Sequence, residues 1–150
     1  MLNATILLVE DDENDALFLL AALKKTQVKN PLHVVTDGRD AIAYLDGTGK
    51  YSDRAHYPVP YLVLLDLKLP QVMGLEVLKH LRQRAELDST IVIVLTASQD
   101  PQDIEKAYHL RANAYLVKPS GLDSLLLLVQ SIKDFWLTQN QPATVFSPDV

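Results

Sequence analysis

Five short apolar segments, each without polar alternation, constrain the fold of this 150-residue chain more than any other feature. They lie at residues 6–9, 32–36, 61–65, 91–95 and 114–117. A strand that is apolar on both faces is typical of a parallel sheet covered by helices on both sides.

Helix-like segments alternate with these strands, at residues 14–26, 40–45, 75–84, 101–112 and 122–137. Residues 47–60 form the longest loop, with two glycines and two prolines. Five strands alternating with five helices predict an α/β fold, a doubly wound parallel sheet with helices on both faces. We expect a single domain over residues 1–138, with an extended last helix, and a flexible tail over residues 139–150.

Composition narrows the class of protein. The apolar fraction of 48% and the charged fraction of 22% are ordinary for a globular chain. A net charge of −5 argues against a broad basic surface for nucleic acid, and the absence of cysteine excludes disulfides and thiolate metal sites. No signal peptide or membrane span is expected, so we expect a cytoplasmic protein. The 32 residues after Lys118 are too few for an output domain, so we expect none.

Polar side chains follow four of the five predicted strands. Glu10 and Asp11 end the first, Asp66 the third, Thr96 the fourth and Lys118 the fifth. Ligands of parallel α/β sheets bind outside the carboxyl ends of the strands, so these side chains are expected to converge at one edge.

The chemistry of that set points to phosphoryl transfer. Oxygen ligands without His or Cys favour Mg²⁺, which also relieves the repulsion among the three carboxylates. Lys118, the Thr96 hydroxyl and Mg²⁺ together would offset the charge of a phosphoryl group. A carboxylate is also a nucleophile that forms an acyl phosphate, and Asp66 is the candidate.

Each residue alone has a plainer interpretation. The acids over residues 10–15 could cap the first helix, Asp66 could be a turn residue, and Lys118 could be a solvated cation. The joint placement of these residue types at the ends of different strands favours the functional interpretation.

The motifs that carry these residues resemble the receiver domain of two-component response regulators. They are ILLVED (6–11), LLDLKLP (64–70) with Gly74, VLTA (94–97) and YLVKP (115–119). The resemblance covers residue 5 to about residue 137, in order and with suitable spacing. It implies a sheet of order 2-1-3-4-5 and phosphotransfer from a histidine kinase to an aspartate.

Carried over position by position, the resemblance makes Asp66 the phosphoacceptor. Glu10 and Asp11 would hold Mg²⁺ together with Asp66 and the backbone carbonyl of Lys68. Thr96 and Lys118 would bind the phosphoryl group after transfer. The resemblance also implies that Tyr115 turns inward on activation and that the Lys118–Pro119 bond is cis.

Two positions depart from the family pattern. Lys68 stands two residues after Asp66, where a neutral side chain such as Asn is common, and its ammonium could alter the lifetime of the phosphate. Met73 precedes Gly74 where Asp is usual, which changes the turn and no reacting group.

A narrower resemblance rests on the insertion over residues 53–60 and on the last helix, which ends DFWL (134–137). Both features are similar to the stand-alone regulators that partner cyanobacterial phytochromes. The kinase would then be a red/far-red photoreceptor.

The last helix also predicts a partner surface. Its core-facing stripe is expected to comprise Leu122, Leu125, Leu126, Val129, Ile132 and Trp136. Leu127, Leu128 and Phe135 add apolar area beyond that stripe, which favours a second buried contact. We expect a homodimer through the fourth helix, fifth strand and fifth helix, coupled to phosphorylation through Thr96 and Tyr115. A C-terminal tail that folds back over these residues is the alternative.

Three other functions compete with that of a receiver. A dinucleotide-binding enzyme is disfavoured because the first strand leads to acids instead of a glycine-rich turn. A Mg²⁺-dependent aspartyl-phosphate phosphatase usually carries a second acid where this chain has Lys68. A pseudo-receiver that binds partners without phosphorylation is disfavoured by the full set of site residues. The sequence therefore predicts a phosphoacceptor protein and not an enzyme that turns over a substrate.

Overall fold

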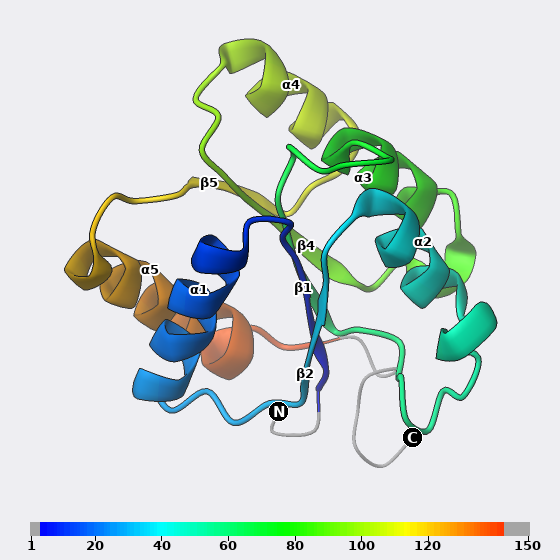
Figure 1. The fold of residues 1–150 in the computed structure, drawn as a ribbon, viewed down its shortest axis with the longest axis horizontal. Helices are drawn as coiled ribbons and strands as arrows, with labels where there is room; N and C mark the ends of the chain where they lie inside the picture. Colours follow the sequence, from blue (N-terminus) through cyan, green and yellow to red (C-terminus); the bar gives the residue numbers. More distant parts are fainter. Residues whose placement is uncertain (1–3, 143–150) are drawn as a thin grey trace.

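The computed structural model describes residues 4–142 and shows a five-stranded parallel sheet (Figure 1). The strands are β1 (Ile6–Val9), β2 (Leu32–Val35), β3 (Leu62–Leu65), β4 (Ile91–Thr96) and β5 (Ala114–Val117). Their order is β2-β1-β3-β4-β5, and every neighbouring pair is parallel. The predicted doubly wound α/β fold and its strand order are confirmed.

Helices cover both faces of this sheet. They are α1 (Glu13–Lys25), α2 (Gly38–Asp46), α3 (Gly74–Arg82), α4 (Pro101–His109) and α5 (Leu122–Asp134). Figure 1 shows α1 and α5 together on one side of the sheet, and α2 and α3 on the other. The chain crosses between strands through these helices, as the alternating apolar segments predict.

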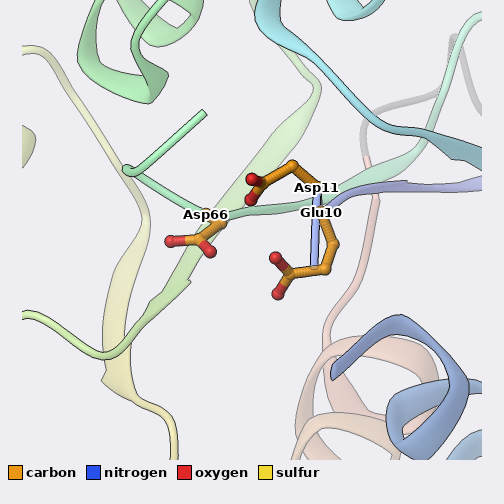
Figure 2. Close-up of side chains that lie close together, drawn as sticks. All are labelled: Glu10, Asp11 and Asp66. Atoms are coloured by element: carbon orange, nitrogen blue, oxygen red, sulfur yellow. The ribbon is translucent and has the colours of Figure 1, made fainter. Parts of the chain in front are cut away.

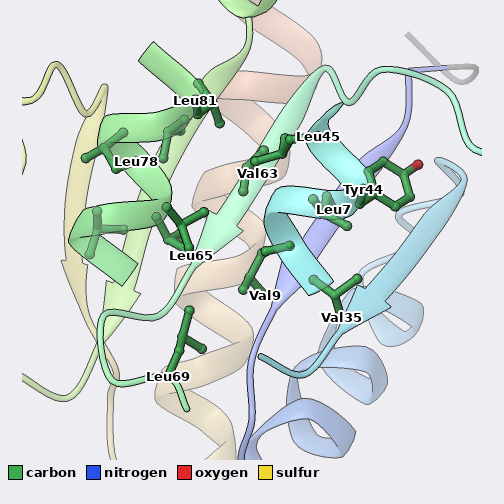
Figure 3. Packing of buried hydrophobic residues seen from close by; sticks show 14 of the residues in the cluster. Leu7, Val9, Val35, Tyr44, Leu45, Val63, Leu65, Leu69, Leu78 and Leu81 are labelled. Atoms are coloured by element: carbon green, nitrogen blue, oxygen red, sulfur yellow. The ribbon is translucent and has the colours of Figure 1, made fainter. Parts of the chain in front are cut away.

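Each layer of helices has its own hydrophobic core against the sheet. Leu7 and Val9 of β1 point into the core beneath α2 and α3 (Figure 3), whereas Ile6 and Leu8 point into the core beneath α1 and α5. β1, β3 and β4 are buried at every position. This two-sided burial explains why the central strands show no polar alternation.

Aspartates define the starts of three helices. The helices α1, α2 and α4 each follow an aspartate whose side chain accepts a backbone N–H from the first turn: Asp12, Asp37 and Asp100. The helix expected at 40–45 begins earlier, at Gly38. A Cβ at Gly38 would lie 1.8 Å from the carbonyl oxygen of Val72, so glycine is needed for this close approach.

The expected helix over 101–112 is shorter in the structure. It ends at His109, and Arg111 has the left-handed φ of 68° that terminates the helix before β5.

The long loop over 47–60 is ordered by its own contacts. It contains one 3₁₀ turn, η1 (Gly49–Tyr51), and a second 3₁₀ turn, η2 (Ala85–Leu87), precedes β4. The guanidinium of Arg54 donates to the backbone carbonyls of Tyr44, Leu45 and Tyr57, which caps the C-terminal end of α2. The loop therefore packs onto α2 as a structured insertion.

The last helix departs from the prediction in three ways. The α-helix ends at Asp134 and continues as a π-helical turn, η3 (Phe135–Gln139). Leu122, expected in the core stripe, is 48% exposed, because it lies at the first turn beside a cavity. Leu128, expected outside the stripe, packs against the core beneath α5.

The chain after α5 is fixed to the amino end of β3. The hydroxyl of Tyr61 donates to the Trp136 carbonyl at 3.2 Å, and the Asn140 amide donates to the same hydroxyl at 3.2 Å. Residues 139–142 of the expected flexible tail are therefore described and in part hydrogen-bonded. Residues 143–150 lie outside the described residues.

No helix within residues 4–142 has the length and apolar character that crossing a membrane requires.

Candidate functional site

Three carboxylates meet where β1 and β3 end. The register pairs Val9 with Leu65, so the residues that follow these strands lie side by side. Glu10, Asp11 and Asp66 each place a carboxylate oxygen within 4.8 Å of the other two (Figure 2). Glu10 and Asp66 are buried, whereas Asp11 is exposed. The predicted convergence of these three acids is present in the structure.

Lys118 brings the compensating cation from the end of β5. Its ammonium Nζ lies 2.5 Å from Glu10 Oε1 and 2.9 Å from Asp66 Oδ2. β5 is separated from β3 by β4, so the lysine side chain reaches across the end of the intervening strand. Thr96 ends that strand and is fully buried. Parallel strands thus deliver the acids, the hydroxyl and the cation to one edge of the sheet.

Burial and neighbouring charges shift the pKa values of Glu10, Asp66 and Lys118 in different directions. Burial raises the pKa of Glu10 from 4.5 to about 7, although its hydrogen bond with Lys118 acts in the opposite direction. Burial also acts to raise the pKa of Asp66, but hydrogen bonds from Lys118 and Thr96 outweigh it and hold that pKa below its ordinary value. Burial alone would lower the pKa of Lys118, yet its hydrogen bonds to the carboxylates raise it. Asp66 is therefore ionised near neutral pH, which is the form in which a carboxylate can act as a nucleophile.

Asp12 and Asp15, which follow β1, make different contacts. Asp12 caps α1 by accepting the Asp15 N–H at 2.9 Å, so the capping interpretation holds for this residue. The Asp15 side chain instead lies 2.9 Å from Lys118 Nζ. Sequence reasoning missed this contact because an acid in the first turn of a helix is explained by the helix dipole alone. Its position in the first turn of α1, directly after the acids that end β1, was the available signal.

The loop between β3 and α3 supports Asp66 through its backbone. The N–H of Lys68 donates to Asp66 Oδ1 at 3.2 Å, while the Lys68 side chain is exposed. Gly74 N–H donates to the Leu67 carbonyl, and a Cβ at Gly74 would lie 2.2 Å from the Asp66 carbonyl oxygen. Met73 precedes α3 and provides no side-chain cap for that helix.

Tyr115 faces the loop that follows β4. Its ring is half-buried, and its hydroxyl donates to the Ser98 carbonyl at 3.0 Å. The Ser98 hydroxyl in turn donates to Asp103 Oδ2 of α4 at 2.6 Å. Tyr115 is thus connected to α4 through the loop two residues after Thr96.

The expected cis bond between Lys118 and Pro119 is wrong, because the peptide is trans in the structure. An X–Pro bond prefers trans by only about 0.5–1 kcal/mol, so the dipeptide alone does not determine the isomer.

The cluster has the donor chemistry of a divalent-cation site. Three carboxylates this close repel one another, and the raised pKa of Glu10 reflects its burial and the charge of Asp66. Oxygen ligands of this kind suit a hard divalent cation. The residues present therefore fit a divalent metal ion.

Comparison with known proteins decides the family. The model of the response regulator receiver domain family matches residues 6–130. The chain belongs to the response regulator receiver family. Membership implies a histidine kinase as the phosphodonor partner.

Two response regulators, one of them a cyanobacterial phytochrome response regulator, are similar to this receiver along most of its length. Response regulator Rcp1 of Synechocystis is 39% identical over 132 residues, which cover 88% of this chain and 88% of Rcp1. The phosphorylated cyanobacterial phytochrome response regulator RcpA superposes with a TM-score of 0.87 at 35% identity, covering 93% of this chain and 98% of RcpA. A Mn²⁺-bound structure of Rcp1 superposes with a TM-score of 0.85 at 37% identity, covering 93% and 99% of the two chains.

Proposed function

We propose that this receiver accepts a phosphoryl group on Asp66 from a histidine kinase. The observation that carries the proposal is the contact of Lys118 Nζ with Asp66 Oδ2 beside two further carboxylates. In the transfer, an Asp66 oxygen attacks the phosphorus of the phosphohistidine. The P–N bond breaks, its electron pair remains on the imidazole nitrogen, and an acyl phosphate forms. Lys118 and the Thr96 hydroxyl then donate to the phosphoryl oxygens.

We propose Mg²⁺ as the divalent ion, held by Glu10, Asp11, Asp66 and the backbone carbonyl of Lys68. When bound, Mg²⁺ offsets the negative charge shared between phosphoryl and carboxylate oxygens. The carboxylates of Glu10, Asp11 and Asp66 would hold the ion, and the contact with Lys118 helps to keep Asp66 ionised.

Intact-mass measurement after incubation with acetyl phosphate tests the phosphoacceptor. We expect a single phosphoryl adduct on the wild type with Mg²⁺, and none with EDTA or with Asp66→Asn. Glu76→Gln, a neutralised acid in α3, is the matched control and should be phosphorylated like the wild type. An adduct that persists in Asp66→Asn would refute Asp66 as the acceptor.

The same incubation, with released phosphate measured beside the protein mass, separates the two alternatives. A pseudo-receiver would remain unmodified under every condition. A phosphatase would hydrolyse many equivalents of a small phosphorylated substrate, whereas a phosphoacceptor only loses its own phosphoryl group. The exposed Lys68 at the position where such a phosphatase carries a second acid favours the acceptor.

We propose a phytochrome-type photoreceptor as the kinase, acting on this receiver in the cytoplasm. The similarity to Rcp1 and RcpA along most of the chain supports it, as does the structured insertion that Arg54 holds against α2. Phosphotransfer from a purified phytochrome kinase should exceed transfer from an unrelated histidine kinase at equal autophosphorylation. It should also differ between red and far-red illumination. Equal rates from both kinases would contradict the assignment.

We propose that residues 1–138 form the receiver with its extended last helix, and that the signal leaves through the surface of the receiver itself. Rcp1 supports this organisation, since the aligned region covers 88% of that protein as well. Limited proteolysis should leave a resistant fragment that includes α5 and η3.

We propose a homodimer through α4, β5 and α5. β5 is one of the two edge strands of the sheet and is only half-buried along its whole length. Leu127 and Phe135 on and after α5 are 72% and 54% exposed. Leu128 packs against the core, so its contribution to the interface is smaller than the sequence suggested.

Sedimentation velocity tests the dimer with Phe135→Asp and Leu127→Asp. Both should shift the protein to monomer, while Leu17→Asp, a comparably exposed apolar residue on α1, should leave the dimer intact. Unchanged sedimentation of both α5 variants would contradict the interface. If Tyr115 couples the site to this face, a beryllofluoride adduct on Asp66 should raise dimer affinity, and dimerisation should raise beryllofluoride affinity by the same factor.

A further inference from the structure

The ammonium of Lys118 has all of its hydrogen-bonding capacity in use. Its three N–H groups face three carboxylates, with Nζ 2.5 Å from Glu10 Oε1, 2.9 Å from Asp66 Oδ2 and 2.9 Å from Asp15 Oδ2. A lysine ammonium has three donors and no acceptor. Any new contact with a phosphoryl oxygen therefore requires Lys118 to release one of these carboxylates.

The three carboxylates differ in how easily they are released. The side chains of Glu10 and Asp66 are 4% and 7% exposed, so either would be left in a poorly solvated position. The Asp15 side chain is 45% exposed, so water can replace the ammonium there at the smallest cost.

Asp15 also has space into which to move. Its side chain lines a cavity of about 410 Å³ between α1 and the start of α5. Lys118 and Asp66 line the same cavity. Phe18 and Leu122 line this cavity and are exposed, so the cavity is open to solvent.

We propose that Asp15 is a positioning residue that competes with the phosphoryl group for Lys118 and is released when Asp66 is modified. The inference rests on the proposed phosphoacceptor function and adds a residue of α1 to it. In the unmodified protein Asp15 holds Lys118 over the site. In the modified protein that contact is lost, so Asp15 lowers the affinity of the site for a phosphoryl group.

The test is the affinity of the full chain for beryllofluoride in the presence of Mg²⁺, measured by ¹⁹F NMR. Asp15→Asn should bind beryllofluoride about three- to tenfold more tightly than the wild type, because an amide is a weaker competitor for the ammonium than a carboxylate. Asp15→Glu keeps the charge and should restore an affinity close to that of the wild type.

Glu13→Gln is the matched control for the loss of a charge. Glu13 lies in the same first turn of α1, and no contact between it and Lys118 is present in the described structure. It should change the affinity less than about twofold, since an exposed charge without a partner is well screened. The helix cap is retained in Asp15→Asn, because the backbone N–H at position 15 donates to Asp12 whatever its side chain.

A double-mutant cycle shows whether Asp15 acts through Lys118. In a Lys118→Met background, Asp15→Asn should have no greater effect than Glu13→Gln. An Asp15→Asn effect that persists in that background, or that equals the effect of Glu13→Gln in the wild type, would overturn the proposal. Beryllofluoride that fails to bind the wild type would instead overturn the phosphoacceptor function, and the competition with it.

Discussion

Lys118 Nζ lies 2.9 Å from Asp66 Oδ2, a contact that joins residues 52 positions apart in the sequence. It forms because β3 and β5 end at the same edge of the parallel sheet. The buried site thus holds Glu10 and Asp66 against the ammonium of a single lysine.

Lys118→Met should destabilise the metal-free protein at neutral pH. Removing the cation leaves the buried carboxylates of Glu10 and Asp66 unpaired, which costs about 3 kcal/mol. Chemical denaturation in EDTA measures the loss. Lys106→Met, an exposed lysine of α4, should change the unfolding free energy by less than about 0.5 kcal/mol. Equal losses in the two variants would contradict the site electrostatics.

Divalent-metal affinity should rise with pH and level off near the pKa of Glu10. That pKa is raised from 4.5 to about 7, so below pH 7 the metal must displace a proton. We expect about a tenfold gain in Mg²⁺ affinity per pH unit between about pH 5 and pH 7. Isothermal titration measures it, and Glu10→Gln should remove most of the pH dependence.

The raised pKa of Glu10 has the opposite effect on the pH dependence of stability in the metal-free protein. Between pH 4.5 and about 7 the folded protein binds the Glu10 proton more tightly than the unfolded chain does. Because the folded state then binds more protons, the contribution of Glu10 to the unfolding free energy falls as pH rises through this window. Comparison of the wild type with Glu10→Gln in EDTA isolates this contribution. A difference that is independent of pH would contradict the raised pKa.

Gly74→Ala should destabilise the protein by more than about 2 kcal/mol. Its Cβ would lie 2.2 Å from the Asp66 carbonyl oxygen and 2.6 Å from Leu67 Cα, so the backbone that carries Asp66 must move. Gly49→Ala is the control for backbone strain without a steric clash. Gly49 has a φ of 59°, and no atom lies within 4 Å of an added Cβ. Gly49→Ala should cost about 1 kcal/mol. A smaller loss for Gly74→Ala than for Gly49→Ala would refute the close approach.

Tyr61→Phe should loosen the chain after α5. The variant loses the hydrogen bond to the Trp136 carbonyl and the one from Asn140, and we expect a loss of about 1 kcal/mol in unfolding free energy. Backbone amides of η3 should exchange faster in hydrogen-exchange measurements. Tyr108→Phe removes a hydroxyl from an exposed residue of α4 and should change neither quantity.

The fold was predictable because its signals are local. Apolar segments without alternation placed all five strands, and aspartates such as Asp12 and Asp100 mark the starts of helices. The ends of elements were less predictable. The end of α4 depends on the left-handed conformation of Arg111. The path of the chain after α5 is fixed by Tyr61, which is 75 residues from Trp136 in sequence.

The site was predictable for a different reason. The carboxyl ends of parallel strands meet at one edge of the sheet. The polar residues that follow each strand were therefore enough to predict that Glu10, Asp66 and Lys118 converge, and the structure shows them in contact. Asp15 was missed because it comes from a helix, where an acid has an adequate local explanation. The exposure of Leu122 was missed because helical periodicity does not show where the neighbouring layer ends.

The position of Lys118 directly after the last strand has a consequence for the order in which the site is synthesised. The ribosome completes the acidic part of the site when Asp66 has been added, but the cation arrives 52 residues later. Until then the acids lack their lysine, and β4 has only one neighbour in the sheet. A nascent or truncated chain that ends before Lys118 therefore carries Glu10 and Asp66 without the ammonium that pairs with their carboxylates. The charges of the site are therefore balanced only after β5 has been added to the edge of the sheet.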